Sequence, residues 1–225
     1  MTATEEIKTV KQTTGKFVQY GCGFSAPAEW INFDASPTLR IQLLPLIGNL
    51  VKSKLPVTFP SGVRYGDIIR GLPNIGPDSC DGVYCSHVLE HLSLDDFRLA
   101  LKNTYRILRK DGIFRCVVPD LERCARSYVK ALDNGEENAS IRFVGVNTLL
   151  GIEQRPRSFA GKLRTAFGNS HHLWMWDQYS LANELKKAGF RNIRRCQFND
   201  SLEPMFKKVE SADRFEGAVA MECVK

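Results

Sequence analysis

The sequence predicts an α/β fold with a mostly parallel sheet of seven strands, covered by helices, whose last two strands form an antiparallel edge. Short apolar runs alternate with helix-patterned segments through the first two-thirds of the chain, an order typical of parallel sheets. One run, Asp81–Ser86, is apolar enough to be buried on both faces. The last two, Arg191–Phe198 and Gly217–Cys223, follow one another without a clear helix between them. The other expected strands are Lys16–Tyr20, Trp30–Asp34, Val63–Tyr65 and Ile113–Val118.

Helices are expected where a capping residue precedes an apolar pattern of helical period. The expected starts are Ser36-Pro37, Ser93 with Asp96, Pro119-Asp120 and Ser180. The first helix covers Leu39–Val51 with a break at Pro45, and the second ends at Lys110-Asp111-Gly112, directly before the strand Ile113–Val118. The last helix ends at Gly189.

Composition indicates one globular domain. The 225 residues are 43% hydrophobic and 25% charged, which is too apolar for a disordered chain. We expect a single domain over 1–225, with 1–15 as a lead-in and the weakly patterned stretch at about 135–177 as a cap insertion. No apolar run approaches the ~20 residues that cross a bilayer. The polar start lacks the apolar core of a secretory signal, so a cytoplasmic protein is expected.

Cysteines and charge narrow the class further. The seven cysteines are odd in number and contain no C-x-x-C pair, which argues against a disulfide framework and a zinc knuckle. The net charge of +6 favours an anionic partner. One basic group lies in the weakly patterned insertion rather than on an expected helix face: Arg155, Arg157, Lys162 and Arg164.

A glycine-rich loop follows the first expected strand. Gly21-Cys22-Gly23-Phe24-Ser25-Ala26 satisfies G-x-G-x-x-[G/A], the pattern of dinucleotide sites in which a helix N-terminus holds the pyrophosphate. Pro27 follows at once and the next strand begins at Trp30, which leaves no room for that helix. Asp34 also comes too soon after the loop for the acidic residue of that pattern. A nicotinamide cofactor is therefore disfavoured.

The same residues suit an adenosine cofactor without a pyrophosphate. Its ribose needs a carboxylate that accepts from two hydroxyls, and Asp34 ends the second expected strand. Its amino-acid part needs bare backbone, which Gly21 and Gly23 provide because they lack Cβ atoms. Asp67, after the third strand, can accept from an adenine amino group. Alternatively, the two carboxylates only stabilise the backbone locally, one as a helix cap and the other as a turn residue.

These motifs occur together in a known family. GCG, WINFDASP, YGDI and DGVYCSHVLEHLSLDDFRLALKNTYRILRKDGIFRCVVPDL, over about residues 17–122, resemble the class I S-adenosylmethionine-dependent methyltransferases, in particular the type 11 group. The later H-x-W-M-W-D-x-Y-S-L resembles a subgroup associated with polysaccharide biosynthesis. The resemblance implies a Rossmann-like fold with S-adenosylmethionine as cofactor. It implies these cofactor-binding residues: Gly21, Cys22, Gly23, Asp34, Ala35, Asp67, Ile68, Ser86 and His87. Gln19 and Ser25 depart from the family pattern, which commonly has an acidic residue and a third glycine there.

One segment matches the sequence pattern of a zinc-binding motif. His87-Val-Leu-Glu90-His91 spells H-x-x-E-H, the signature of one class of zinc peptidases. Such a site needs His87 and His91 on one face of a helix, with Glu90 as base. The motif directly follows a buried strand, which disfavours that geometry, and the family resemblance explains the letters without metal. We expect no metal here. Glu90 and His91 are expected to fasten the following helix, and His87 is open between structure and chemistry.

The expected reaction is methyl transfer to an oxygen of a small-molecule or glycan acceptor, in which the protein aligns the acceptor and removes its proton. Side chains in the insertion suit either a sugar pocket or ordinary packing: His171, His172, Trp174, Trp176 and Asp177. His171 or His172 is the first candidate for the catalytic base, and His87 is the next. An RNA methyltransferase is an alternative that the basic charge favours, although no RNA-binding module accompanies it. A non-catalytic cofactor-binding protein is another.

Overall fold

The computed structural model describes residues 15–45, 58–152 and 171–225. Its strands are β1 (Phe17–Tyr20), β2 (Ile31–Asp34), β3 (Arg64–Tyr65), β4 (Cys80–Ser86), β5 (Leu108–Pro119), β6 (Arg191–Arg195) and β7 (Ala218–Val224). They form one sheet in the order β3-β2-β1-β4-β5-β7-β6. The first five strands are parallel, whereas β7 runs antiparallel to both β5 and β6. The predicted mostly parallel, Rossmann-like sheet with an antiparallel edge is confirmed.

Three of the four expected helix starts are confirmed, whereas α7 begins at Gln178 with Asp177 as its cap, before the expected Ser180. The helices are α1 (Pro37–Gln42), η1 (Leu89–His91), α3 (Leu94–Ile107), α4 (Leu121–Asp133), α5 (Ala139–Ile141), the π-helical turn η2 (Arg142–Asn147), α7 (Gln178–Lys187), η3 (Pro204–Lys208) and α8 (Ala212–Phe215). Ser36, Ser93 and Asp120 each accept a hydrogen bond from a backbone N–H in the first turn of α1, α3 and α4. These bonds satisfy donors that a helix start leaves unpaired. Helix α1 ends before Pro45.

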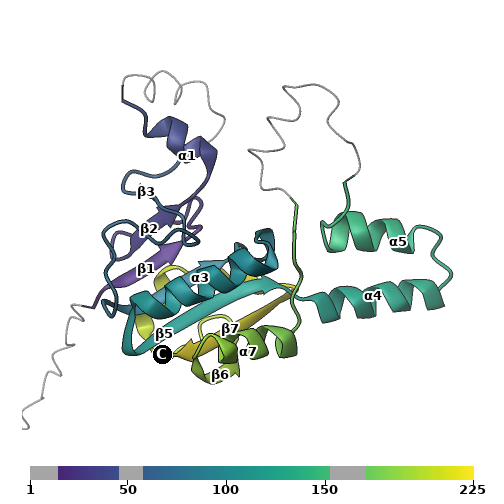
Figure 1. Ribbon diagram of the computed structural model, residues 1–225. Helices are drawn as coiled ribbons and strands as arrows, with labels where there is room; N and C mark the ends of the chain where they lie inside the picture. The colour runs from purple at the N-terminus through teal and green to yellow at the C-terminus, as the bar shows by residue number, and fades with distance from the viewer. Residues whose placement is uncertain (1–14, 46–57, 153–170) are drawn as a thin grey trace, which may run out of the picture.

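Helices α3 and α7 cover one face of the sheet (Figure 1). Phe97 and Leu101 of α3 and Leu181 and Leu185 of α7 are buried in one cluster with Phe114 of β5. The apolar residues of α3 recur at helical spacing, so they form a single stripe that faces the sheet.

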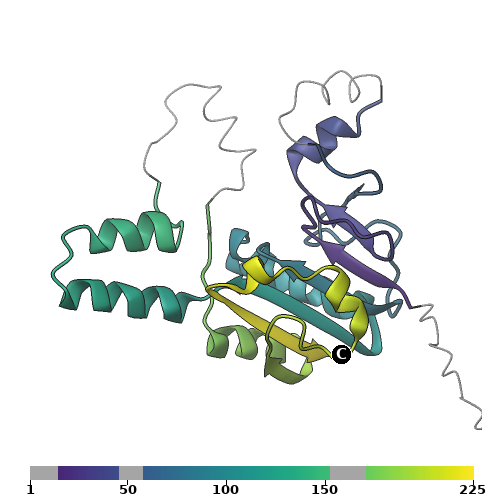
Figure 2. The same cartoon turned by 180° about the vertical axis from the view of Figure 1, so that it is seen from behind.

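The segment between β6 and β7 covers the opposite face (Figure 2). Its anchor is Phe206 of η3, which is fully buried, with its ring 5.5 Å from that of Trp30 and 6.4 Å from that of Tyr84. The sequence shows no clear helix here because η3 and α8 have only five and four residues. Helices of that length are too short for an apolar period to be detected.

Strand β5 begins earlier than the sequence predicts. Leu108 is fully buried and pairs with Cys80 of β4, so the strand starts there rather than at Ile113. Lys110-Asp111-Gly112 therefore lies inside β5 and does not terminate α3, which ends at Ile107.

The expected cap insertion has two described parts. Helix α5 and η2 pack along α4, where the rings of Tyr128 and Phe143 are 5.0 Å apart, and together they extend away from the sheet in both views (Figures 1 and 2). The chain returns at 171–177 beside the end of β5, where Leu121 donates from its backbone N–H to the carbonyl of Trp176 at 2.8 Å. Residues 153–170 lie outside the described part.

Trp176 and Asp177, whose residue types suit a sugar pocket, contribute to the fold instead. Trp176 is buried and stacks on Phe97 at a centroid distance of 4.1 Å, so it belongs to the core. Asp177 forms a capping box with Ser180 at the start of α7. In the described part of the chain, no helix is long and apolar enough to cross a membrane.

Candidate functional site at the carboxyl ends of the strands

A cavity of about 430 Å³ opens at the carboxyl ends of β1, β2 and β4. It is lined by residues from four short segments at or just after the ends of these strands and β3: 20–21, 34–38, 66–69, and 87–88 with 91–92. Ligands of parallel sheets bind at this edge because the loops of neighbouring strands converge there. The convergence brings together six of the predicted cofactor-binding residues: Gly21, Asp34, Ala35, Asp67, Ile68 and His87.

The loop after β1 adopts a conformation that glycine favours. Gly21 and Gly23 have φ angles of +65° and +54°, in the left-handed region where a Cβ atom adds strain. At Gly21 a Cβ atom would also lie 2.1 Å from Cγ2 of Val88, so the backbone here approaches the segment after β4 more closely than any other residue allows. A larger residue at position 21 would therefore force the loop away from the segment after β4.

Two buried side chains hold the loop in place. Gln19 donates from Nε2 to the carbonyl of Ser25 at 2.7 Å and to Oδ1 of Asn32 at 2.6 Å. Asp34 accepts from the backbone N–H of Gly23 at 3.1 Å and from that of Ser36 at 2.8 Å. The loop therefore runs from β1 to β2 without a helix, as the sequence predicts, because both strands fasten it directly.

Asp34 and Asp67 each accept hydrogen bonds from nearby backbone N–H groups and also line the cavity. The two backbone hydrogen bonds of Asp34 occupy about half of the roughly four lone-pair sites of a carboxylate. Asp67 accepts from the backbone N–H of Ile69 at 2.9 Å, and its side chain is 24% exposed. Both carboxylates thus keep acceptor capacity toward the cavity that they line.

The other predicted cofactor residues lie next to this cavity rather than in its wall. Cys22 and Ser86 line a second cavity of about 60 Å³, which shares Tyr20 and Gly21 with the first. Gly23 touches the site through its N–H bond to Asp34. A ligand in the main cavity would meet these residues only by extending over the loop.

His87 stands directly after β4 in the left-handed conformation, with φ of +54°. Its Nε2–H donates to the carbonyl of Arg214 at 2.9 Å, and its Nδ1 lies 3.3 Å from Oε1 of Glu90. Burial lowers the pKa of His87, but the Glu90 carboxylate and the Arg214 carbonyl raise it, and the net shift is upward. This imidazole lines the cavity.

The histidines of the distant segment 171–177 meet η1 behind the cavity. The ring of His172 lies edge-on to that of His91, with 5.0 Å between centroids, and the carbonyl of His171 accepts from Nδ1–H of His91 at 3.0 Å. Burial is the main cause that lowers the pKa of His172. Of the three predicted catalytic histidines, His87 lines the cavity, whereas His171 and His172 are not part of its wall.

Glu90 and His91 are the functional candidates that the sequence analysis assigned to fastening alone. His91 lines the cavity, and Glu90 is fully buried beside it. The H-x-x-E-H letters were the available signal, but they suggested a helical pair of histidines. The segment is instead a left-handed His87 followed by the 3-10 helix η1, so the i,i+4 face of the peptidase motif does not form.

The predicted basic group, Arg155, Arg157, Lys162 and Arg164, lies outside the described residues. Trp174, ten residues after Arg164, is 41% exposed.

Comparison with known proteins gives a family match over most of the chain. The sequence matches the methyltransferase domain family over residues 14–195. No curated protein matches it. The structure is similar to that of an S-adenosylmethionine-dependent methyltransferase from Archaeoglobus fulgidus, with 15% identity, a TM-score of 0.47 and coverage of 94% of this chain and 86% of that one. For a methyltransferase from Thermotoga maritima the identity is 19%, the TM-score 0.49 and the coverage 94% and 82%.

Proposed function

The chain belongs to the methyltransferase domain family, and we propose that it transfers the methyl group of S-adenosylmethionine to an oxygen of a small-molecule or glycan acceptor. The observation that carries the proposal is the cavity of about 430 Å³ in which the glycine loop, Asp34 and Asp67 meet. The loop between β1 and β2 contains no helix, so the helix N-terminus that holds the pyrophosphate in a dinucleotide site is not present after the glycine loop.

The chemistry of the cavity fits the cofactor. The free lone pairs of Asp34 suit the two ribose hydroxyls, and the bare backbone at Gly21 suits the amino-acid part. Asp67 can accept from the adenine amino group, and the buried Ile68 offers an apolar contact to the ring. S-adenosylmethionine bound there supplies an electrophilic methyl group. The proposed cofactor site comprises Gly21, Cys22, Gly23, Asp34, Ala35, Asp67, Ile68, Ser86 and His87.

We place the acceptor at the end of the cavity formed by His87 and His91. An acceptor hydroxyl must lose its proton as its oxygen attacks the methyl group, and imidazoles change protonation near neutral pH. Of the predicted base candidates, His87 lines this end, whereas His172 and the backbone carbonyl of His171 contact His91 outside the cavity wall.

The acceptor class follows from charge and sequence resemblance. The basic group Arg155, Arg157, Lys162 and Arg164 precedes the histidine segment by a few residues. Arginine binds phosphate in a bidentate manner, so we propose an anionic acceptor such as a phosphate-linked sugar or glycan precursor. The resemblance of residues 172–181 to the polysaccharide-associated subgroup supports a glycan.

Ligand-induced stabilisation tests the cofactor site. S-adenosylhomocysteine at ~100 times its Kd should stabilise the folded chain by about 2.7 kcal/mol, or ~5–10 °C in Tm for a protein of this size. Asp34→Asn should remove most of this shift. The matched control is Asp177→Asn, because Asp177 also accepts two backbone hydrogen bonds but does not line the cavity. NADH should shift Tm little. An undiminished shift in folded Asp34→Asn protein would contradict the proposal.

A further inference from the structure

Two segments far apart in the sequence are clamped together at the histidine end of the cavity. The carbonyl of Glu90 in η1 accepts backbone N–H bonds from Leu173 at 2.7 Å and from Trp174 at 3.1 Å. His172 donates its own backbone N–H to the carbonyl of Leu149 at 3.1 Å. These bonds fix His172 beside η1, so that one ligand-type atom from each of Glu90, His91 and His172 lies within 4.8 Å of the others.

This cluster contains buried polar atoms that the described residues leave without a hydrogen-bond partner. Both carboxylate oxygens of Glu90, whose side chain is 0% exposed, are in this state, and so is Nδ1 of His172, which is 8% exposed. The contact from His87 Nδ1 to Glu90 lies at 3.3 Å but outside hydrogen-bond geometry. Unpaired buried polar atoms destabilise a fold unless a ligand satisfies them.

His91 is oriented as a metal-ligating histidine usually is. Its Nδ1–H donates to the carbonyl of His171, which fixes the tautomer and leaves the lone pair on Nε2. That Nε2 lies 3.9 Å from Oε1 of Glu90, a separation that allows both atoms to contact one ion. No hydrogen bond between the two atoms competes with such an ion.

We infer that Glu90, His91 and His172 form a site for a divalent transition-metal ion of the zinc class. Two imidazoles and one carboxylate are ligands that Zn²⁺ prefers, and three protein ligands leave a coordination position open. The site differs from the H-x-x-E-H peptidase pattern, since Glu90 is a ligand rather than a base and the second histidine comes from a distant segment.

The metal site deepens, and rests on, the proposed methyl transfer. His91 belongs to the cluster and also lines the cavity, so an ion held by the cluster would lie next to the proposed acceptor end. An acceptor hydroxyl bound to the ion would give up its proton more readily to His87 in the cavity wall, while its oxygen forms the new bond to the methyl carbon and the carbon–sulfur bond of the cofactor breaks. His172 is then a ligand, and the acceptor must offer an oxygen that can bind a metal.

Metal titration of the full chain tests the site. Chelator-treated protein is titrated at neutral pH with Co²⁺, followed by visible absorption, and with Zn²⁺, followed by equilibrium dialysis and elemental analysis. We expect one ion per chain and a cobalt spectrum typical of nitrogen and oxygen ligands without thiolate. Glu90→Gln and His172→Gln should each weaken binding at least ~100-fold, because loss of even an outer-sphere partner costs ~10–100-fold. His171→Gln is the matched control and should bind as the native chain does, since only its backbone carbonyl is used.

Each outcome bears on the inference. Absence of stoichiometric binding would overturn it. Binding that survives in both Glu90→Gln and His172→Gln, or a cobalt spectrum with thiolate bands, would place the ion elsewhere. If Glu90→Gln fails to fold, His172→Gln alone decides. Stabilisation by S-adenosylhomocysteine is measured in the same preparations. Metal binding without stabilisation by S-adenosylhomocysteine would contradict the proposed function but support the metal site. Stabilisation by S-adenosylhomocysteine without metal binding would support the proposed function and contradict the metal site.

Discussion

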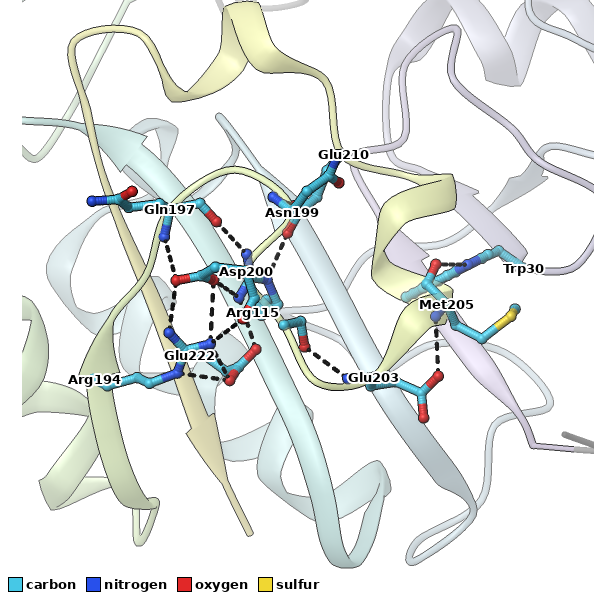
Figure 3. A network of polar contacts seen from close by, with 11 residues as sticks. Trp30, Arg115, Arg194, Gln197, Asn199, Asp200, Glu203, Met205, Glu210 and Glu222 are labelled. Atoms are coloured by element: carbon cyan, nitrogen blue, oxygen red, sulfur yellow. Dashed lines mark hydrogen bonds and ion pairs between the residues drawn. The ribbon is translucent and has the colours of Figure 1, made fainter.

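The guanidinium group of Arg115 lies 2.6 Å from the carboxylate of Glu210, and the two side chains are 1% and 0% exposed. Arg115 also donates to Asp200 at 2.9 Å and to Glu222 at 2.7 Å, as Figure 3 shows. These bonds tie the centre of β5 to β7 and to the segment that covers one face of the sheet. That segment continues to Arg214, whose carbonyl positions His87.

Replacing the central cation of this network should destabilise the fold strongly. Arg115→Met should lower the free energy of unfolding by ~3–5 kcal/mol, because removal of one partner leaves buried carboxylates uncompensated. Urea unfolding measures the change. The control is Arg109→Met, whose half-exposed side chain pairs with Asp81 and should contribute only ~0–1 kcal/mol. Equal costs for the two variants would show that the Arg115 network does not stabilise the fold.

The buried glutamine under the glycine loop gives a second test. Gln19 is 3% exposed and uses its amide N–H groups as donors to two oxygens, so Gln19→Glu would place a carboxylate against two acceptors. We expect this variant to lose at least ~2 kcal/mol of stability. Gln19→Met, which removes the bonds without adding charge, should lose less. Thermal unfolding compares them, and a Gln19→Glu protein as stable as Gln19→Met would refute the arrangement of donors.

Stability should also depend on Glu184 in a defined pH range. Hydrogen bonds from Arg98 and Lys187 lower the pKa of Glu184 from 4.5 to about 2. A carboxyl whose pKa is lower in the folded state stabilises it above pH 4.5, and this stabilisation disappears as the pH falls toward 2. Glu184→Gln should therefore cost about 1 kcal/mol at neutral pH, since both partners are about half exposed.

Urea midpoints of native and Glu184→Gln protein measure this difference at several pH values. The difference should shrink as the solution is acidified, and a difference that is constant with pH would contradict the assignment. Glu122→Gln removes an exposed i,i+4 partner of Arg126 and should cost at most ~0.5 kcal/mol.

The parts of the site that lie on strand ends could be predicted from the sequence, because strand order brings them to one edge. Asp34 is the last residue of β2 and Asp67 follows β3, and both line the cavity. The pairing of Glu90 with His172 could not be predicted in this way. Their contact depends on backbone bonds between η1 and a segment about 80 residues later, and no local period encodes such a contact.

The weakly patterned region shows the same limit. Trp176 and Asp177 have the residue types of a sugar pocket, yet one packs in the core and the other caps a helix. Residue type alone does not distinguish these parts, because aromatic rings serve both packing and binding. The short helices η3 and α8 were missed for a related reason, since a single anchor such as Phe206 holds them without a repeated pattern.

The close approach of Gly21 to Val88 yields the sharpest mutational test of the loop. Gly21→Ala adds a Cβ atom at positive φ and within 2.1 Å of Val88 Cγ2, whereas Gly23→Ala adds one at positive φ into open space. Both should carry the cost of a left-handed alanine, ~1–3 kcal/mol, and Gly21→Ala should carry the clash in addition.

Val88→Ala in the Gly21→Ala background removes the clashing methyl groups, so the double mutant should recover part of the loss. A double-mutant cycle in urea should give a favourable coupling of ~0.5–3 kcal/mol. Zero coupling, with Gly21→Ala no worse than Gly23→Ala, would mean that the loop and the segment after β4 are not in contact. Gly21 and Val88 would then not form adjacent parts of the cavity wall.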